Sequence, residues 1–198
     1  DRITTHAIDL RRYTSGTVRE VLDLLDRADR ELVMRIREVE DGTARKRALT
    51  ERLAILRETS RKVRDNLTEA IRDHVGEVAR STQRTVVAAL KKGAIDMGLE
   101  VALDALSPQQ LVAAAVSRPL DGRHLEDWVK GLEESRRERV QRQLQLGYVQ
   151  GDSIEDVVRR IRGTRARGYR DGVLQMSHRS ATALVRTATT HSENVAIQ

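Results

Sequence analysis

The residues best able to do chemistry are gathered in one arginine-rich segment, RRIRGTRARGYRDG, at residues 159–172. Residues 159–179 contain seven arginines and one aspartate, so this stretch carries the same formal net charge, +6, as the whole chain. Guanidinium groups bind phosphate oxygens through paired hydrogen bonds, and a tyrosine ring offers a face for base stacking. The segment is therefore a candidate for sequence-independent contact with nucleic acid. The more common interpretation of such a charge run is a solvated loop, or a loop that pairs with acidic residues of a neighbouring subunit. The candidate contact residues are Arg159, Arg160, Arg162, Arg165, Arg167, Tyr169 and Arg170.

Residues for other kinds of site are sparse. The five histidines are scattered, and none pairs with another at a metal-binding spacing. Ser177 and His178 are adjacent polar residues of an expected helix, and no nucleophile elbow or phosphate-binding loop accompanies them. The chain has no cysteine, which excludes disulfides and thiolate metal sites within it. We therefore expect no catalytic residues, no metal and no cofactor in these residues, and interpret the chain as not an enzyme.

Composition favours an all-α fold. The chain has one Trp, three Tyr, no Phe and only two Pro, so Leu, Val, Ile and Ala must fill its core. Such side chains suit the packing of helix against helix. Charged residues make up 33% of the chain and alternate in sign, as on long solvated helices. No apolar run is long enough to span a membrane.

Two long helices are expected in the first half of the chain. An extended arm at residues 1–13 is followed by a helix that begins near Ser15 or Thr17 and ends at Asp41-Gly42. A second helix runs from about Ala44 to Ala105, with a bend expected near Gly93 and Gly98. A helix of this length must pack in a hairpin, in a coiled coil or against other subunits.

Shorter helices are expected after residue 106. Ser107-Pro108-Gln109-Gln110 is a helix start, LDGR at 120–123 is a turn, and a helix follows from about His124 to Gln150. Gly151-Asp152-Ser153 stops that helix and caps the next one, which ends at Gly163. We therefore predict an N-terminal arm and long-helix region at 1–106 and a helical bundle at 107–198. The last helix carries no stop signal, so we expect the bundle to be truncated at its C-terminal end.

The last third of the chain resembles the phage Mu F-like family of head-morphogenesis proteins, also called minor capsid proteins. The family pattern is a capped short helix, G-x-S-x-x-x-[IV]-x-x-x-[IVL]-x-G, followed by a helix with [IL]-[AV]-R-T-x(6)-N-x-A. The resemblance covers roughly residues 147–198, and the start of the chain is similar in a less specific way. The first part of the pattern is matched by Gly151, Ser153, Val157, Ile161 and Gly163. The second part is matched by Leu184, Val185, Arg186, Thr187, Asn194 and Ala196.

The resemblance implies an internal head protein of a tailed phage that acts in head morphogenesis, with a role in DNA packaging or ejection. The implied partners are the phage portal protein or the major capsid protein, with several copies around the portal, and packaged double-stranded DNA. The implied location is the capsid interior near the portal vertex, after assembly in the host cytoplasm. The alternative is a DNA-binding protein that is ejected with the genome and uses the arginine-rich loop.

The polar residues of the second motif share adjoining faces of one helix. Arg186, Thr190 and Asn194 follow one another at steps of four residues, and Thr187 lies three residues before Thr190. Such groups need hydrogen-bond partners when they are buried. We interpret them as a polar clasp that holds the capped helix at 153–162 or the turn before it, rather than as a ligand site.

Overall fold

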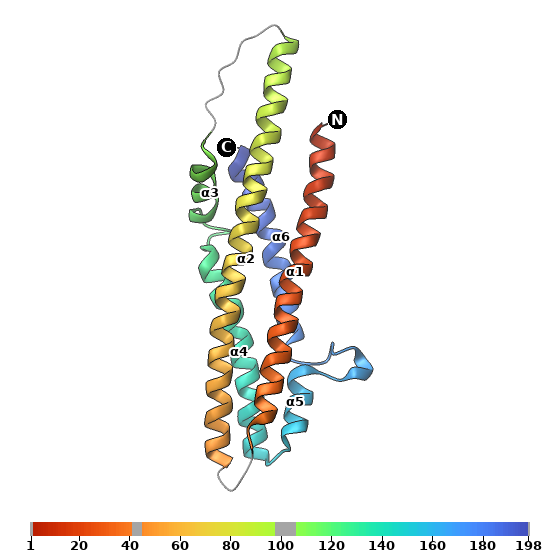
Figure 1. The fold of residues 1–198 in the computed structure, drawn as a ribbon, viewed down its shortest axis with the longest axis vertical. Coiled ribbons are helices and arrows are strands. Elements are labelled where there is room, and N and C mark those ends of the chain that lie inside the picture. Colours follow the sequence, from red (N-terminus) through yellow and green to blue (C-terminus); the bar gives the residue numbers. More distant parts are fainter. Residues whose placement is uncertain (1, 41–44, 98–105, 198) are drawn as a thin grey trace. The chain divides into compact units, whose positions relative to one another are not determined.

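The chain folds as an all-α protein, as predicted (Figure 1). The computed structural model describes residues 2–40, 45–97 and 106–197. Within these ranges there are six α-helices, one short 3-10 helix and no strand. The elements are α1 (Arg2–Glu38), α2 (Arg45–Asp96), α3 (Pro108–Ser117), α4 (Leu125–Gln150), α5 (Ile154–Arg162), the 3-10 helix at Arg165–Arg167, and α6 (Gln175–Ile197).

The first helix begins much earlier than predicted. α1 already runs from Arg2, so the extended arm at 1–13 and the start near Ser15 or Thr17 are wrong. Hydroxyl side chains in this stretch look like N-caps in the sequence, but they bond inside the helix. The Ser15 hydroxyl donates to the carbonyl of Arg11 at 2.8 Å, and the Thr17 hydroxyl donates to that of Tyr13 at 3.3 Å. Such bonds to the residue four positions earlier satisfy Ser and Thr within a helix.

An arginine of the second helix donates hydrogen bonds to carbonyl groups at the end of the first helix. α1 ends at Glu38, and the predicted stop at Asp41-Gly42 lies outside the described residues. The buried Arg52 donates to the carbonyl of Ile36 at 3.1 Å and to that of Val39 at 2.7 Å. The last carbonyls of a helix have no partner in the helix itself, and a basic side chain is a common substitute.

The second helix is long, as predicted. α2 begins at Arg45, one residue after the expected start, and passes through Gly93 to Asp96. The expected extension to Ala105 and the bend at Gly98 lie outside the described residues. None of the helices in the described ranges is both long enough and apolar enough to cross a membrane.

The boundaries of the shorter helices agree with their predicted caps. Ser107 and Gln110 form a reciprocal capping box at the start of α3, with Pro108 in its first turn. Leu120 and Arg123 close the LDGR turn by paired backbone hydrogen bonds. The Ser153 hydroxyl accepts a hydrogen bond from the backbone N–H of Asp156 and caps α5.

The helices group into two compact units. Unit 1 contains residues 1–19, 68–127 and 183–198, and unit 2 contains residues 20–67 and 128–182. Each unit combines residues from both sides of residue 106, so the division at 106/107 stays a prediction.

Unit 2 is built on a helical hairpin, one of the predicted alternatives. Its core is aliphatic and joins α1 and α2 with α4 and α5 through Leu32, Ile36, Leu56, Val140 and Ile161. These side chains are almost completely buried, and burial of each contributes about 1.5–3 kcal/mol. In unit 1, the core residues of α2 are joined by two from α3, Leu111 and Ala115.

Candidate nucleic-acid interface

Two glycines close the base of the arginine-rich loop at residues 163–172. Gly163 ends α5 with φ of 91°, a conformation that only glycine adopts easily, and a Cβ there would lie 2.7 Å from the Asp171 carboxylate. Gly172 packs so closely that a Cβ would overlap the carbonyl group of Arg162. Backbone hydrogen bonds from Val173 to Arg160 at 3.2 Å and from Leu174 to Ile161 at 3.3 Å continue the closure. The loop projects beyond the end of α5 (Figure 1).

The single acidic residue of the loop is used inside it. The Asp171 carboxylate accepts hydrogen bonds from the backbone N–H and the hydroxyl of Thr164, both at 2.8 Å. These bonds, the backbone bond first, lower the pKa of Asp171. Tyr169 closes the same turn, because its N–H donates to the carbonyl of Thr164 at 2.9 Å. The carboxylate therefore holds the two sides of the loop together.

Three of the predicted contact residues point to solvent. Arg165, Arg167 and Arg170 are exposed, and no ion pair joins any of them to a carboxylate of the described residues. Arg165 and Arg167 lie in the short 3-10 helix, and Arg170 follows two residues with positive φ, Gly168 and Tyr169. A closed loop that presents three exposed guanidinium groups can bind phosphate oxygens.

The other three arginines are already engaged. Arg159 pairs with Asp156 at 3.0 Å, and Arg160 pairs with Asp152 at 2.6 Å. Arg162 lies over the ring of Tyr169, with its guanidinium carbon 4.2 Å from the ring centroid. One face of the tyrosine ring is thus covered by a cation. The structure therefore divides the predicted set into three free arginines and three that stabilise the loop and its helix.

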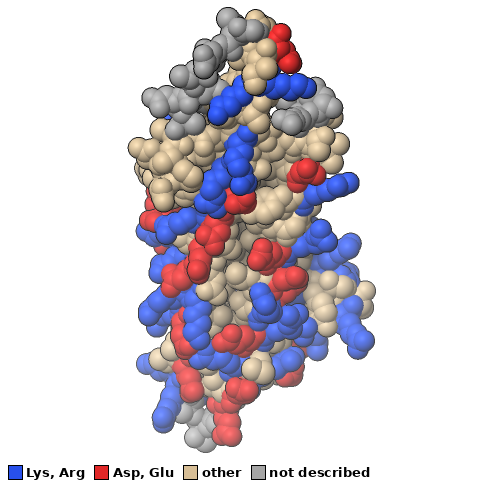
Figure 2. Space-filling model, turned by 45° about the horizontal axis from the view of Figure 1, so that its top comes forward, with Lys and Arg blue, Asp and Glu red and all other residues tan. Residues whose placement is uncertain are grey.

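Charges of both signs are mixed on the face seen in Figure 2, where Lys and Arg are interspersed with Asp and Glu. Ion pairs outside the loop include Arg35–Glu58 at 2.7 Å and Arg72–Glu126 at 3.0 Å. Such surface pairs each contribute about 0–1 kcal/mol and leave little net potential.

The motif residues occupy helix caps and exposed positions. Gly151 has φ of 74° and Ser153 caps α5, so the first part of the motif forms the capped helix that the sequence predicts. In the second part, Arg186, Thr190 and Asn194 are exposed and Thr187 is half-buried. The interpretation of these side chains as a polar clasp on the capped helix stays a prediction.

A different polar cluster lies on the other face of α6. The buried Thr189 approaches Nε2 of the buried His74 at 2.8 Å, and Thr17 approaches Nδ1 of the same ring at 2.9 Å. His191 lies 3.1 Å from the carbonyl of Ala115 in α3. Sequence reasoning favoured a hydrogen-bonded or solvent-facing role for every histidine and did not single out His74. Its place on the apolar seam of α2, between Ile71 and Val78, was the available signal.

One group of side chains has the ligand atoms for a metal ion. Asp26, Asp29 and His178 hold three such atoms within 4.8 Å of one another. However, Arg136 donates to one oxygen of Asp29 through Nε and Nη2, and His178 lies 3.2 Å from the other oxygen. The guanidinium already supplies the positive charge that a cation would bring. The arrangement is better explained as a buried ion-pair network.

Comparison of the chain with protein-family models, with curated proteins and with solved structures gave no match. The resemblance to the phage Mu F-like family therefore stays a prediction from the residues of its two-part motif.

Proposed function

We propose that the chain is a non-enzymatic internal head protein of a tailed phage, associated with the portal vertex or the inner capsid. The observation that carries the proposal is the two-part motif: residues 151–163 cap and form α5, and residues 184–196 follow in α6. The arginine-rich loop lies between the two parts. In this role it faces packaged DNA, with the phosphate backbone as its ligand.

Affinity capture from infected cells tests the head-protein role. The full chain serves as bait in a lysate of the infected source cells, with and without nuclease, and mass spectrometry identifies the partners. The expected result is a nuclease-resistant complex with the phage portal or major capsid protein. Recovery of DNA alone, lost on nuclease treatment, would overturn the portal association and favour the second candidate below.

The second candidate is a DNA-binding protein that is ejected with the genome. The three free arginines of the closed loop favour it, because they would contact duplex DNA without regard to sequence. It predicts micromolar binding whose logarithm falls steeply with the logarithm of salt concentration. Each phosphate contact contributes a slope of about −0.9, so replacing all three with Ala should reduce the slope by about 3.

A charge-matched control separates the loop from general attraction. Arg57, Arg61 and Arg179 are also exposed and lie outside the loop. Their triple Ala variant loses the same formal charge as the variant with Arg165, Arg167 and Arg170 replaced. Fluorescence anisotropy with a labelled duplex should show a strong loss of affinity only in the loop variant. Equal losses in both variants would mean that net charge, and not the loop, attracts DNA.

A further inference from the structure

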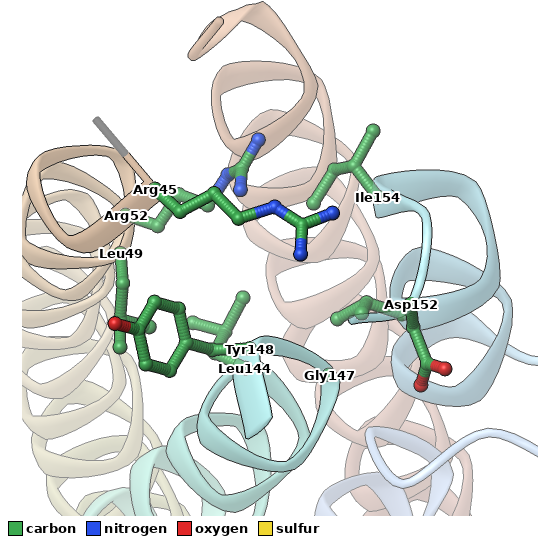
Figure 3. Close-up of a pocket in the computed structure, with 9 residues that line it drawn as sticks. Arg45, Leu49, Arg52, Leu144, Gly147, Tyr148, Asp152 and Ile154 are labelled. Carbon is green, nitrogen blue, oxygen red and sulfur yellow. The ribbon is translucent and has the colours of Figure 1, made fainter. Parts of the chain in front are cut away.

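A small pocket lies in unit 2 where the start of α2 meets the end of α4 and the start of α5 (Figure 3). Its volume is about 30 Å³. Sites for small-molecule ligands usually measure roughly 300–1,000 Å³, so this pocket is an order of magnitude too small for them. It has room for about two water molecules, which is enough for the end of one inserted side chain. The apolar residues that line it are Leu49, Leu144, Ile154 and Val157.

The wall of the pocket formed by α4 and α5 is fixed by close packing. Gly147 is buried, and a Cβ there would overlap the side chain of Val157. Leu144 and Val157 belong to the aliphatic core of the unit, and Leu49 and Ile154 pack against that core while remaining half-buried. The pocket is therefore an indentation at the edge of the core, and core packing holds its α4 and α5 wall in place.

The charge at the mouth of the pocket is positive. The Arg45 side chain extends from α2 across the mouth towards the turn between α4 and α5 (Figure 3). The side chain reaches the turn itself, since a Cβ atom placed on Gly151 would lie 3.5 Å from Nη1 of Arg45. Arg45 is exposed, and none of the described carboxylates forms an ion pair with it.

The other charged residues of the lining are engaged. Arg52 donates to the carbonyls at the end of α1. The Asp152 carboxylate accepts a hydrogen bond from Arg160 at 2.6 Å, and Figure 3 shows it turned away from the Arg45 guanidinium. The free charge at this pocket is thus one guanidinium beside an apolar floor.

One exposed aromatic side chain lines the pocket, and an exposed aliphatic residue follows it in the sequence. Tyr148 lines the pocket and is 42% exposed, and the next residue of α4, Val149, is 80% exposed. Large apolar side chains on the last turn of a helix, next to an apolar indentation, are typical of a surface that contacts another protein.

We propose that this pocket binds an aliphatic side chain of a partner protein whose neighbouring residue carries a carboxylate. The aliphatic side chain enters between Leu49, Leu144 and Val157, and the carboxylate accepts hydrogen bonds from Arg45. Charge complementarity selects an acidic neighbour over a neutral or basic one. The proposal rests on the pocket alone, and its outcome is independent of DNA binding by the arginine-rich loop.

Methyl NMR of the full chain tests this proposal, because all four apolar lining residues carry methyl groups. The probe is the capped peptide acetyl-Ala-Leu-Glu-Ala-amide, compared with its Leu-Gln and Ala-Glu counterparts. The Leu-Glu peptide should shift the methyl signals of Leu49, Leu144, Ile154 and Val157. It should bind about two- to fivefold more tightly than the Leu-Gln peptide, the range expected for an exposed ion pair.

A matched pair of variants identifies the cation. Arg45→Gln should abolish the preference for Glu over Gln and leave the weaker Leu-dependent binding. Arg47→Gln removes another exposed charge from the same turn of α2, outside the pocket, and should leave the preference intact. The proposal is overturned if the Leu-Glu peptide does not shift the four methyl signals, if the Ala-Glu peptide binds equally well, or if the preference survives in Arg45→Gln.

Discussion

The imidazole of His74 stacks on the ring of Tyr13, with the centroids 5.2 Å apart and the ring planes inclined by 15°. Hydroxyls of Thr17 and Thr189 lie 2.9 and 2.8 Å from its two ring nitrogens. The Thr189 hydroxyl donates to the carbonyl of Val185 at 3.0 Å, so its oxygen can accept from Nε2–H. Nδ1 then accepts from the Thr17 hydroxyl, which shares its proton with the more distant Tyr13 carbonyl at 3.3 Å. The geometry suits a neutral imidazole that joins α1, α2 and α6 within unit 1.

The stability of the protein should therefore fall in mild acid. Burial lowers the pKa of His74 from 6.5 to about 4. Below pH 6.5 the unfolded chain takes up a proton that the folded chain excludes, so the contribution of His74 is complete above that pH and is lost as the pH falls to about 4. The difference in pKa corresponds to a loss on the order of 3 kcal/mol of unfolding free energy, measured by urea titration across this range.

A second histidine provides the control for this effect. His124 is exposed, so His124→Gln should keep the pH dependence of the parent chain between pH 6.5 and 4. His74→Gln should be less stable at neutral pH but should lose that part of the dependence. If both variants retain the parent slope, other groups cause the acid sensitivity.

The ion pair between Asp29 and Arg136 should behave as a buried pair. The Arg136 side chain is fully buried and that of Asp29 is 11% exposed. Asp29→Asn leaves the guanidinium without its carboxylate and should reduce the unfolding free energy by about 3–5 kcal/mol. Asp26→Asn, at a half-exposed carboxylate 3.7 Å from His178, should cost less than about 1 kcal/mol.

Replacing both partners of that pair tests the cause. Asp29→Leu combined with Arg136→Met removes both charges and should recover most of the stability lost in Asp29→Asn. Urea unfolding of the two single variants and the double variant gives the coupling energy. If the double variant lost as much stability as the two single variants together, a buried charge without its partner would not explain the loss.

The parts of the fold that could be predicted are those specified by local signals. Ser107 and Ser153 bond to backbone groups three residues away, so their role as caps is readable in the sequence. The start of α1 was not readable in this way. Thr and Ser hydroxyls serve equally well as caps and as donors to a carbonyl four residues back, and only the packing of α1 decides between them.

The candidate site was predictable in composition and not in detail. The local density of arginine identified the loop, and glycines at 163 and 172 suggested its ends. Which arginines stay free depends on Asp152, Asp156 and the ring of Tyr169. The role of Thr189 could not be predicted, because its partner His74 is 115 residues away. The exposure of Arg186 and Asn194 likewise depends on which face of α6 packs inward.

Closure of the arginine-rich loop should depend on Gly172. In Gly172→Ala the new methyl would overlap the Arg162 carbonyl group, so the backbone must move. Overpacking of this kind usually costs about 1–3 kcal/mol of unfolding free energy. Gly131→Ala provides the control, because a Cβ at that position of α4 would meet no atom within 4 Å other than its chain neighbours and the nearby backbone of its own helix. It should leave stability unchanged or raise it by up to about 1 kcal/mol, and a similar loss in both variants would contradict the explanation.

The covered ring of Tyr169 makes a final prediction about the ligand of the loop. Because Arg162 covers one face of the ring, 4.2 Å from its centroid, only the other face is open to a base, and phosphates should be the main contact. Tyr169→Asn keeps a residue that tolerates the positive φ of 61° and removes the ring. If the loop binds DNA, this variant should retain duplex and single-stranded affinity within about twofold at fixed salt. Stacking on a base contributes about 1–3 kcal/mol, so a loss of single-stranded binding beyond about fivefold, with duplex binding unchanged, would show that the ring contacts bases.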